Sequence, residues 1–539
     1  MPIGTAFHER TLPLCHSLNY REWSGYYTVS VYEVHHEHEY NAIRNACALI
    51  DISPLYKYLI TGKDATRLVN RVITRDINKV KVGQVIYCCW CDEEGKVIDD
   101  GTISRLEENV YRWTAADPSL RWFRQNGLNM DVQIEDISEK VAALALQGPT
   151  SAKLLKTVAD ADIANLKYFR VTRGKIAGIP VDISRTGYTG DLGYEIWVPW
   201  KDGVKVWDAL AEKGKQFDLH AAGMLALDVA RVEAGLLLIE VDYTSSKKAL
   251  IPSQKFSPYE LGFAKMVHLD KENFIGKRAL EHDSKKGVPR QLAGLVIDWT
   301  DVEQLYERYG LTPAAPAQAS RVAVPVYSGD KQVGKATTTT WSPTLKKMIS
   351  LASLETEYSK PGTPLQMEIT IEAMRLKANV KVATLPFFNP PRKTATPDLN
   401  ELQAGSTLYL PVFVKGALIW TGDSHCRQGN GEMNLEAIEC AYKEIEIQPI
   451  VHKGMKTDWP WAETPTHWIF LGFDEDLTEA TKIAVRNTID WLSTQKMVPM
   501  DRYEAYALTS IAVDCDITQM VDIRKGVHCM VPKSIFVKK

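Results

Sequence analysis

Residues 184–198 combine an aromatic ring, a carboxylate and closely spaced glycines in one short stretch. The segment SRTGYTGDLGYEIWV has three glycines within seven residues. They let the backbone turn tightly and let a flat ligand approach without a Cβ in the way. Tyr188 offers a ring that can cover a flat heterocycle, and Glu195 offers a carboxylate that accepts hydrogen bonds from ring N–H groups. The stretch predicts either a site for such a ligand or an ordinary hairpin of the same composition.

A second concentration of ligand-type residues lies in the segment GDSHCRQGNGEMNLEAIE, residues 422–439. Asp423 and His425 are two residues apart, so on a strand they share a face. Glu432 adds a carboxylate a little further along. Carboxylate and imidazole ligands suit a hard or borderline divalent metal such as zinc. The run predicts a metal site or, failing that, a structural segment.

The cysteines and the clustered histidines are weaker indications of a functional site than these two segments. Nine cysteines are scattered without the spacing of a disulfide framework, which indicates reduced thiols and a cytoplasmic location. In the cluster CCWC, Cys89 and Cys91 share one face of a strand and Cys88 faces the other way, which favours buried strand residues over a metal site. The cluster of His35, His36 and His38 favours the solvated start of a helix, with a metal site as the alternative.

Composition limits the class of protein. The 539 residues are 45% hydrophobic and 24% charged with a net charge of −3, which is typical of a soluble protein of about three or four domains. No long basic run indicates nucleic-acid binding. The polar N-terminus is unlike a signal peptide, and no apolar run reaches the length of a membrane span.

The elements that would position these residues do not alternate strictly between strand and helix, which favours an α+β fold over a doubly wound sheet. After Gly294 the chain turns to short β runs typical of a small antiparallel barrel or sandwich. Hydrophobic spacing predicts helices at 64–73, 151–158, 204–213 and 223–236, a strand at 141–147, and hairpins at 85–103 and 184–198.

Five motifs resemble those of the glycine-cleavage T-protein family, aminomethyltransferases that use tetrahydrofolate, and they occur in the family's order along the chain. They are GKVIDD at 95–100, ALQGP at 145–149, RTGYTGDLGYEIWVP at 185–199, FIGKRAL at 274–280 and WSPTL at 341–345. The resemblance covers about residues 1–395 and implies three subdomains in a cloverleaf around a folate channel. We expect a folate-binding region at 1–290, a C-terminal β-barrel at 291–388, a proline-rich linker at 389–398 and a separate segment at 399–539.

The resemblance also implies roles for particular residues. Asp100, the second aspartate of the GKVIDD motif, would lie beside the reacting nitrogen of folate as the catalytic residue. Glu195 would bind the pterin, with Tyr188 and Tyr87 as aromatic neighbours in the cofactor site. A carboxylate at position 100 can hold a proton or stabilise positive charge as the carbon moves.

Departures from the family pattern lie at the substrate end. The family's arginine in a Gly-Ala-Arg-Asp motif is Leu227, which removes a charge and up to five donors. An asparagine pair of the family's channel reads Thr114 and Asp117. These changes argue against glycine cleavage and against a lipoyl carrier protein as partner. They leave the one-carbon donor open between an aminomethyl compound and a small N-, S- or O-methylated one.

Residues 399–539 resemble the C-terminal half of the acetamidase/formamidase family, through GDSHCRQGNGE, TLYLPVFVKGAL and the final GVHCMVPKSIF. The resemblance implies a metal-bound hydroxide attacking a small amide, with zinc or another divalent metal held by Asp423, His425 and Glu432. The family's N-terminal half does not precede this segment, so a structural or oligomerisation role is the alternative. The whole-chain hypothesis is a tetrahydrofolate-dependent one-carbon transferase. Its rivals are the amidase and a folate-binding regulator without turnover.

Overall fold

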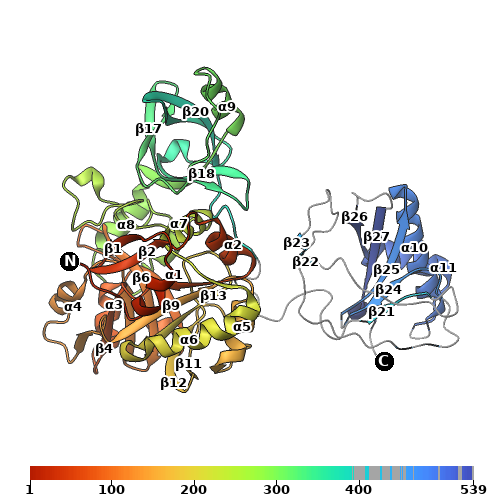
Figure 1. Ribbon diagram of the computed structural model, residues 1–539, viewed down its shortest axis with the longest axis horizontal. Coiled ribbons are helices and arrows are strands. Elements are labelled where there is room, and N and C mark those ends of the chain that lie inside the picture. Colours follow the sequence, from red (N-terminus) through yellow and green to blue (C-terminus); the bar gives the residue numbers. More distant parts are fainter. Residues whose placement is uncertain are drawn as a thin grey trace. The chain divides into compact units, whose positions relative to one another are not determined.

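The structure is a computed structural model in which two stretches of chain form separate compact units, Met1–Asp398 and Leu399–Lys539 (Figure 1). It describes residues 1–390, 393, 407–411, 425–427, 438–439, 450, 452, 457–464, 466–495, 498–519 and 525–536, with the backbone alone at 425–427, 438–439 and 519. In the described part of the chain, no helix is long and apolar enough to cross a membrane.

The first unit is built on a seven-stranded sheet that is covered on both faces. Helices α5 (Ser151–Val158) and α6 (Gly203–Gly214) pack against one face, and α2 (Glu37–Asn45) and α7 (Met224–Glu233) pack against the other. The strand order is β10 (Ala159–Asp160), β11 (Val171–Ile176), β12 (Ile179–Ser184), β13 (Gly193–Pro199), β9 (Val141–Gln147), β3 (Cys47–Asp51) and β14 (Leu219–Ala221). Apolar residues fill both interfaces, as expected of a sheet between two layers of helices.

A second sheet of five strands lies in the same unit. Helices α3 (Ala65–Val72) and α4 (Leu120–Asn126) cover it, and α3 buries the four residues that its spacing predicted: Ala65, Leu68, Val69 and Val72. The strand order is β5 (Val85–Cys91), β6 (Val97–Glu107), β7 (Val110–Ala115), β4 (Tyr56–Thr61) and β8 (Gln133–Asp136). On β5, Cys88 faces the core under the helices while Cys89 and Cys91 face the other side, as alternation predicted.

The β runs after Gly294 form a closed barrel, so the barrel and not the sandwich is confirmed. Helix α9 (Trp299–Glu307) packs Val302 and Leu305 into its core. The strand order around the barrel is β15 (Arg290–Ile297), β18 (Lys347–Glu355), β17 (Lys331–Ser342), β16 (Val324–Ser328), β19 (Pro364–Ile371) and β20 (Met374–Ala383). The unit is completed by α1 (His8–Leu14), the hairpin β1 (Asn19–Trp23) and β2 (Tyr26–Val31), and α8 (Lys277–Lys286).

The second unit is a five-stranded sheet with two helices. The 18-residue α10 (Leu477–Thr494) packs on β25 and β27, and α11 (Arg502–Ala512) packs beside it. The strand order is β21 (Thr407–Tyr409), β24 (Trp461–Glu463), β25 (His467–Asp474), β27 (Lys525–Pro532) and β26 (Asp514–Gln519), with a separate pair of β22 (His425–Arg427) and β23 (Ile438–Glu439). The expectation of a β-rich segment is confirmed, and the segment also contains the helices α10 and α11.

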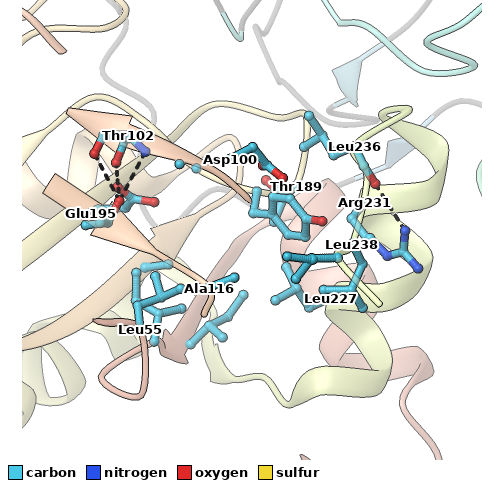
Figure 2. A pocket seen from close by; sticks show the side chains of 18 of the residues that line it. Leu55, Asp100, Thr102, Ala116, Thr189, Glu195, Leu227, Arg231, Leu236 and Leu238 are labelled. Carbon is cyan, nitrogen blue, oxygen red and sulfur yellow. Dashed lines mark hydrogen bonds between the residues drawn. The ribbon is translucent and has the colours of Figure 1, made fainter. Parts of the chain in front are cut away.

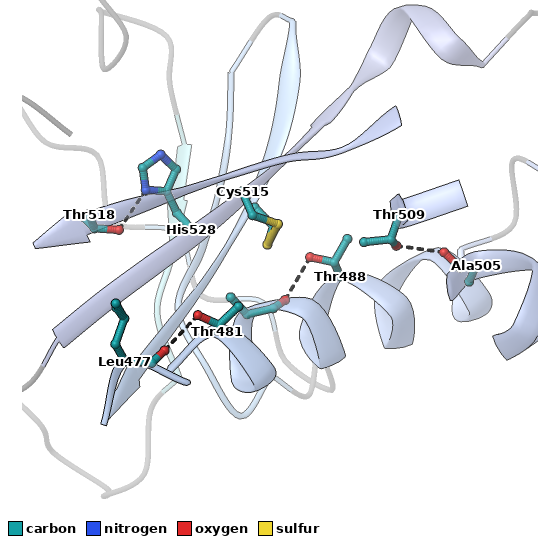
Figure 3. The surroundings of a disulfide bond; sticks show 10 residues. Leu477, Thr481, Thr488, Ala505, Thr509, Cys515, Thr518 and His528 are labelled. Atoms are coloured by element: carbon teal, nitrogen blue, oxygen red, sulfur yellow. Dashed lines mark hydrogen bonds between the residues drawn. A yellow bond between two sulfur atoms is a disulfide. The ribbon is translucent and has the colours of Figure 1, made fainter. Parts of the chain in front are cut away.

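Three local expectations need correction. Cys515 and Cys529, directly opposite on β26 and β27, form a disulfide, so not every cysteine is reduced as predicted (Figure 3). Helix α7 ends at Glu233, three residues before the predicted end, because the chain turns there through Gly235 with φ +65°. At the start of α2, His36 is buried and not solvated, and burial lowers its pKa.

Candidate active site

A cavity of about 560 Å³ in the first unit collects the residues that the sequence marked. Strands β5, β6 and β7 of the small sheet, strand β13 of the large sheet and helix α7 all contribute to its walls. Asp100, Tyr87, Tyr188, Glu195 and Leu227 all line it. In the view of Figure 2, Asp100 lies between Glu195 on the strand side and Leu227 on the helix side.

Asp100 is held by two tyrosines. The register of β5 against β6 pairs Tyr87 with Thr102 and Cys89 with Asp100, which places Tyr87 and Asp100 on one face. The Tyr87 hydroxyl donates to Asp100 Oδ2 at 2.5 Å, and the Tyr243 hydroxyl donates to Oδ1. Burial raises the pKa of the Asp100 carboxyl, and the two hydroxyl donors oppose that rise. The carboxyl is thus fixed in direction and poised to hold a proton more readily than an exposed aspartate.

Asp99, the preceding residue, has a different role. Its side chain is fully buried, and it accepts the backbone N–H of Asp100 at 2.8 Å and of Asp117 at 3.0 Å. Burial first, and then the adjacent Asp100, raises the pKa of Asp99 well above its usual range. Asp99 therefore positions the backbone that carries Asp100 and does not itself line the cavity.

Glu195 is presented by the predicted hairpin. Ser184 on β12 pairs with Glu195 on β13, and the Thr186 hydroxyl donates to Glu195 Oε2 at 2.6 Å. The Ser184 hydroxyl is a second donor near this carboxylate. Burial raises the pKa of Glu195, while Thr186 and the nearby Arg112 oppose the rise. The half-buried carboxylate can still accept from a ligand that brings N–H donors, because its two oxygens have about four acceptor sites.

The glycines of the hairpin make room for the glutamine of the ALQGP motif. The Gln147 amide donates to the carbonyls of Thr186 and Tyr194, and its Oε1 accepts the Thr189 hydroxyl at 2.8 Å. A Cβ on Gly187 or on Gly193 would lie 2.1–2.2 Å from Gln147 Oε1. A side chain at either position would displace the Gln147 amide from these hydrogen bonds, so glycine at both positions lets the two motifs meet.

Tyr188 lies in the loop between β12 and β13, and its hydroxyl donates to the carbonyl of Leu237. Burial raises the pKa of this phenol. With the hydroxyl engaged by backbone, the ring is what Tyr188 offers to the cavity.

The positions that depart from the family pattern also line the cavity. Leu227 and Met224 give helix α7 an apolar surface there. Thr114 pairs with Thr102 through their hydroxyls at 2.6 Å, and Asp117 forms an ion pair with Lys248 at 2.5 Å. Both residues line the cavity, so the altered positions share one space with Asp100.

Three residues that line the cavity or bond Asp100 were not predicted from the sequence. Tyr243 bonds Asp100 from a separate loop, and Arg21 and Arg321 line the cavity from β1 and from the segment before β16. None of them falls within a recognised motif, and each is distant in the sequence from Asp100. No local pattern could have identified them.

The predicted metal ligands Asp423 and Glu432 lie outside the described residues, and His425 is described by its backbone alone, in β22. Within the part of the chain whose side chains are described, no three residues of metal-ligand type gather in one place.

Comparison with known proteins agrees with the fold. The family described as GCVT N-terminal domain matches residues 16–271, and the glycine cleavage T-protein C-terminal barrel domain matches residues 290–389. The acetamidase/formamidase family matches residues 357–538. The crystal structure of glycine cleavage system aminomethyltransferase T from Bartonella henselae superimposes with a TM-score of 0.60 at 20% identity, covering 72% of this chain and 99% of that one, which shows a shared fold.

Two curated relatives extend the similarity to sequence. The aminomethyltransferase of Thermoanaerobacter sp. (strain X514) is 35% identical over 345 residues, which is 63% of this chain and 86% of the relative. That of Bacillus pumilus (strain SAFR-032) is 35% identical over 356 residues, 65% of this chain and 89% of the relative. The chain therefore belongs to the aminomethyltransferase family of enzymes, and it carries an acetamidase/formamidase-type segment at its C-terminal end.

Proposed function

We propose that this enzyme moves a one-carbon unit from a small aminomethyl or methylated donor to tetrahydrofolate. The observation that carries the proposal is Asp100, which two tyrosine hydroxyls fix in a cavity that Glu195 also lines. Family membership supports a one-carbon transfer, and the altered positions 114, 117 and 227 leave the donor open.

The cavity's donor and acceptor groups fit tetrahydrofolate. Its volume of about 560 Å³ lies within the usual range for small-molecule sites. Glu195 would accept N–H groups of the pterin, and the rings of Tyr87 and Tyr188 would cover its faces. When bound, tetrahydrofolate supplies the nucleophilic nitrogen that takes the carbon. Asp100 would hold or release a proton beside that nitrogen, or stabilise positive charge at the carbon.

Replacing Glu195 by glutamine is expected to weaken tetrahydrofolate binding by about 10- to 100-fold, since a charged acceptor becomes neutral at a partly buried site. Isothermal titration of the full-length protein measures this against a wild-type Kd on the order of micromolar. Glu303→Gln, at an exposed position on α9, is the control and should bind as wild type. Absence of tetrahydrofolate binding to the wild-type protein would overturn the proposal.

A second candidate function, metal-dependent hydrolysis of small amides, is favoured by the family match over residues 357–538. We expect the full-length protein with added Zn²⁺ to release ammonia from formamide or acetamide. The double change Asp423→Asn and His425→Asn should abolish that release and leave tetrahydrofolate binding unchanged. A wild-type protein that releases no ammonia and retains no metal in elemental analysis would remove this candidate.

A further inference from the structure

The cavity wall at helix α7 contains a cluster of three arginines. Three guanidinium groups, those of Arg21, Arg231 and Arg321, lie within 4 Å of the single carboxylate of Asp228 on helix α7. Arg321 is bidentate, with Nε at 2.9 Å and Nη2 at 2.6 Å from Oδ2. Arg231 Nε donates to Oδ1 at 3.1 Å.

Asp242 forms an ion pair with only one of the three arginines, the deeply buried Arg231. Its Oδ2 accepts from Arg231 Nη1 at 2.5 Å, and its Oδ1 accepts the hydroxyls of Thr337 and Thr338. The charge of Arg231 is thus paired with that of Asp242, and Asp228 remains as the carboxylate that pairs with Arg21 and Arg321. One carboxylate faces two guanidinium groups, which leaves an excess of one positive charge.

Arg21 is the less well satisfied of these two. Its Nε donates to the Ser30 hydroxyl at 3.2 Å, its Nη1 lies 3.8 Å from Asp228, and its terminal nitrogens donate to no described residue. The side chain is three-quarters buried, with 25% exposed. Burial and then the neighbouring Arg321 lower the pKa of Arg21, while Asp228 opposes them. An anion here would relieve both the desolvation and the repulsion.

Three further acidic residues line the cavity, and Lys248 forms ion pairs with two of them, Asp117 and Glu240. Glu22 accepts the backbone N–H of Gly25 at 2.6 Å, Asp117 is paired with Lys248, and Glu240 accepts the N–H of Ser245. Arg21 and Arg321 share the cavity with the apolar surface of Leu227 and Met224. The arrangement therefore joins a cationic group to an apolar wall.

We propose that Arg21 and Arg321 bind a carboxylate of the one-carbon donor, so that the donor is a methylated or aminomethyl acid. A guanidinium pair can bind a carboxylate through several charge-assisted hydrogen bonds, and the apolar wall suits the methyl-bearing portion. This assignment rests on the proposed transfer to tetrahydrofolate, because it identifies the donor of that reaction.

The test uses a matched series of the form CH3–X–CH2–COO⁻, with X as NH, S or O, and the corresponding primary amides. Each compound is titrated into the full-length protein, with and without saturating tetrahydropteroate, which lacks the glutamyl carboxylates of folate. We expect at least one acid to bind about tenfold or more tightly than its amide. Arg21→Gln should remove that preference, Arg21→Lys should restore part of it, and the exposed Arg67→Gln should behave as wild type.

Two results would overturn the assignment. One is that no acid binds more tightly than its amide, although tetrahydropteroate binds. The other is that Arg21→Gln weakens tetrahydrofolate but not tetrahydropteroate, which would assign the two arginines to the glutamyl tail of folate. If neither pterin binds, the transferase proposal fails by itself. In that case an acid preference that Arg21→Gln removes would still support the anion site, and its absence would overturn the site too.

Discussion

Asp100→Asn is expected to lower the rate of one-carbon transfer by about 10²- to 10⁴-fold, the range usual for loss of a positioned acid–base group. Asparagine keeps the shape of the side chain and can still bond the hydroxyls of Tyr87 and Tyr243, but it cannot hold a negative charge or exchange a proton. Tetrahydrofolate binding should remain within a few-fold of wild type. Single-turnover assays that detect the folate product by mass measure the rate.

The pH profile separates a chemical role of Asp100 from a structural one. Because burial raises the pKa of Asp100, the wild-type rate should rise with pH through a value above the ordinary one for aspartate. The Asp100→Asn variant should lack that acid limb. The exposed Asp270→Asn is the matched control and should keep both rate and profile. An Asp100→Asn enzyme with full activity would mean that this carboxyl takes no part in transfer.

The thermal midpoint adds an independent check on Asp100. A carboxyl whose folded pKa is raised favours the protonated state on folding. Above its folded pKa, the ionised carboxyl therefore makes the folded state less stable than a neutral group would. At neutral pH, Asp100→Asn should leave the thermal midpoint unchanged or raise it. Loss of activity together with greater stability is typical of a functional residue held in an unfavourable environment.

Local sequence patterns predicted much of the fold because they depend on neighbours in the chain. The alternation in the CCWC strand and the spacing of α3 are set by residues two to four positions apart, and both match the structure. The barrel followed from short β runs and turns. The disulfide between Cys515 and Cys529 did not follow, since their pairing depends on the register of β26 against β27.

Only those residues of the candidate site that lie in a motif were predicted from the sequence. Asp100 and Glu195 come from segments 95 residues apart, and the motifs alone marked them, while the cavity that they share is a property of packing. Tyr243, which bonds Asp100 across 143 residues, lies in no motif. The arginine cluster around Asp228 requires β1, α7 and the segment between α9 and β16 to meet, and these are far apart in the sequence.

The network around Arg44 shows how the hairpin that bears Glu195 is held. The Arg44 side chain is 2% exposed, and its Nε and Nη2 donate to Glu233 Oε2 at 2.9 and 2.6 Å. Its Nη1 donates to the Thr189 carbonyl at 2.9 Å, within the loop between β12 and β13. Glu233 also accepts the hydroxyls of Tyr40 and Ser342, so the group ties α2, the loop, α7 and the barrel strand β17 together.

Arg44→Met is expected to lower the free energy of unfolding by about 3–5 kcal/mol, because it leaves the buried carboxylates of Glu233 and Asp191 without this cation. Urea unfolding followed by tryptophan fluorescence measures the change, and the unfolding of the second unit, which also contains tryptophans, is common to all variants. The exposed Arg67→Met should shift it by less than about 0.5 kcal/mol. Arg44→Lys should fall between the two, since lysine keeps the charge but lacks the planar fork.

A double-mutant cycle shows whether the loss comes from the ion pair. If the unpaired Glu233 carboxylate causes most of the cost, then adding Glu233→Gln to Arg44→Met should recover part of the stability, because only the buried carboxylate of Asp191, 3.3 Å from Arg44 Nη1 in the wild type, then lacks the cation of Arg44. Additive losses would instead assign the effect to packing against Phe388, whose ring centre lies 4.4 Å from the guanidinium. Because Arg44 bonds the loop that carries Tyr188, the methionine variant should also bind tetrahydrofolate more weakly than its remaining folded fraction explains. Unchanged affinity per folded molecule would show that Gln147 alone fixes the loop.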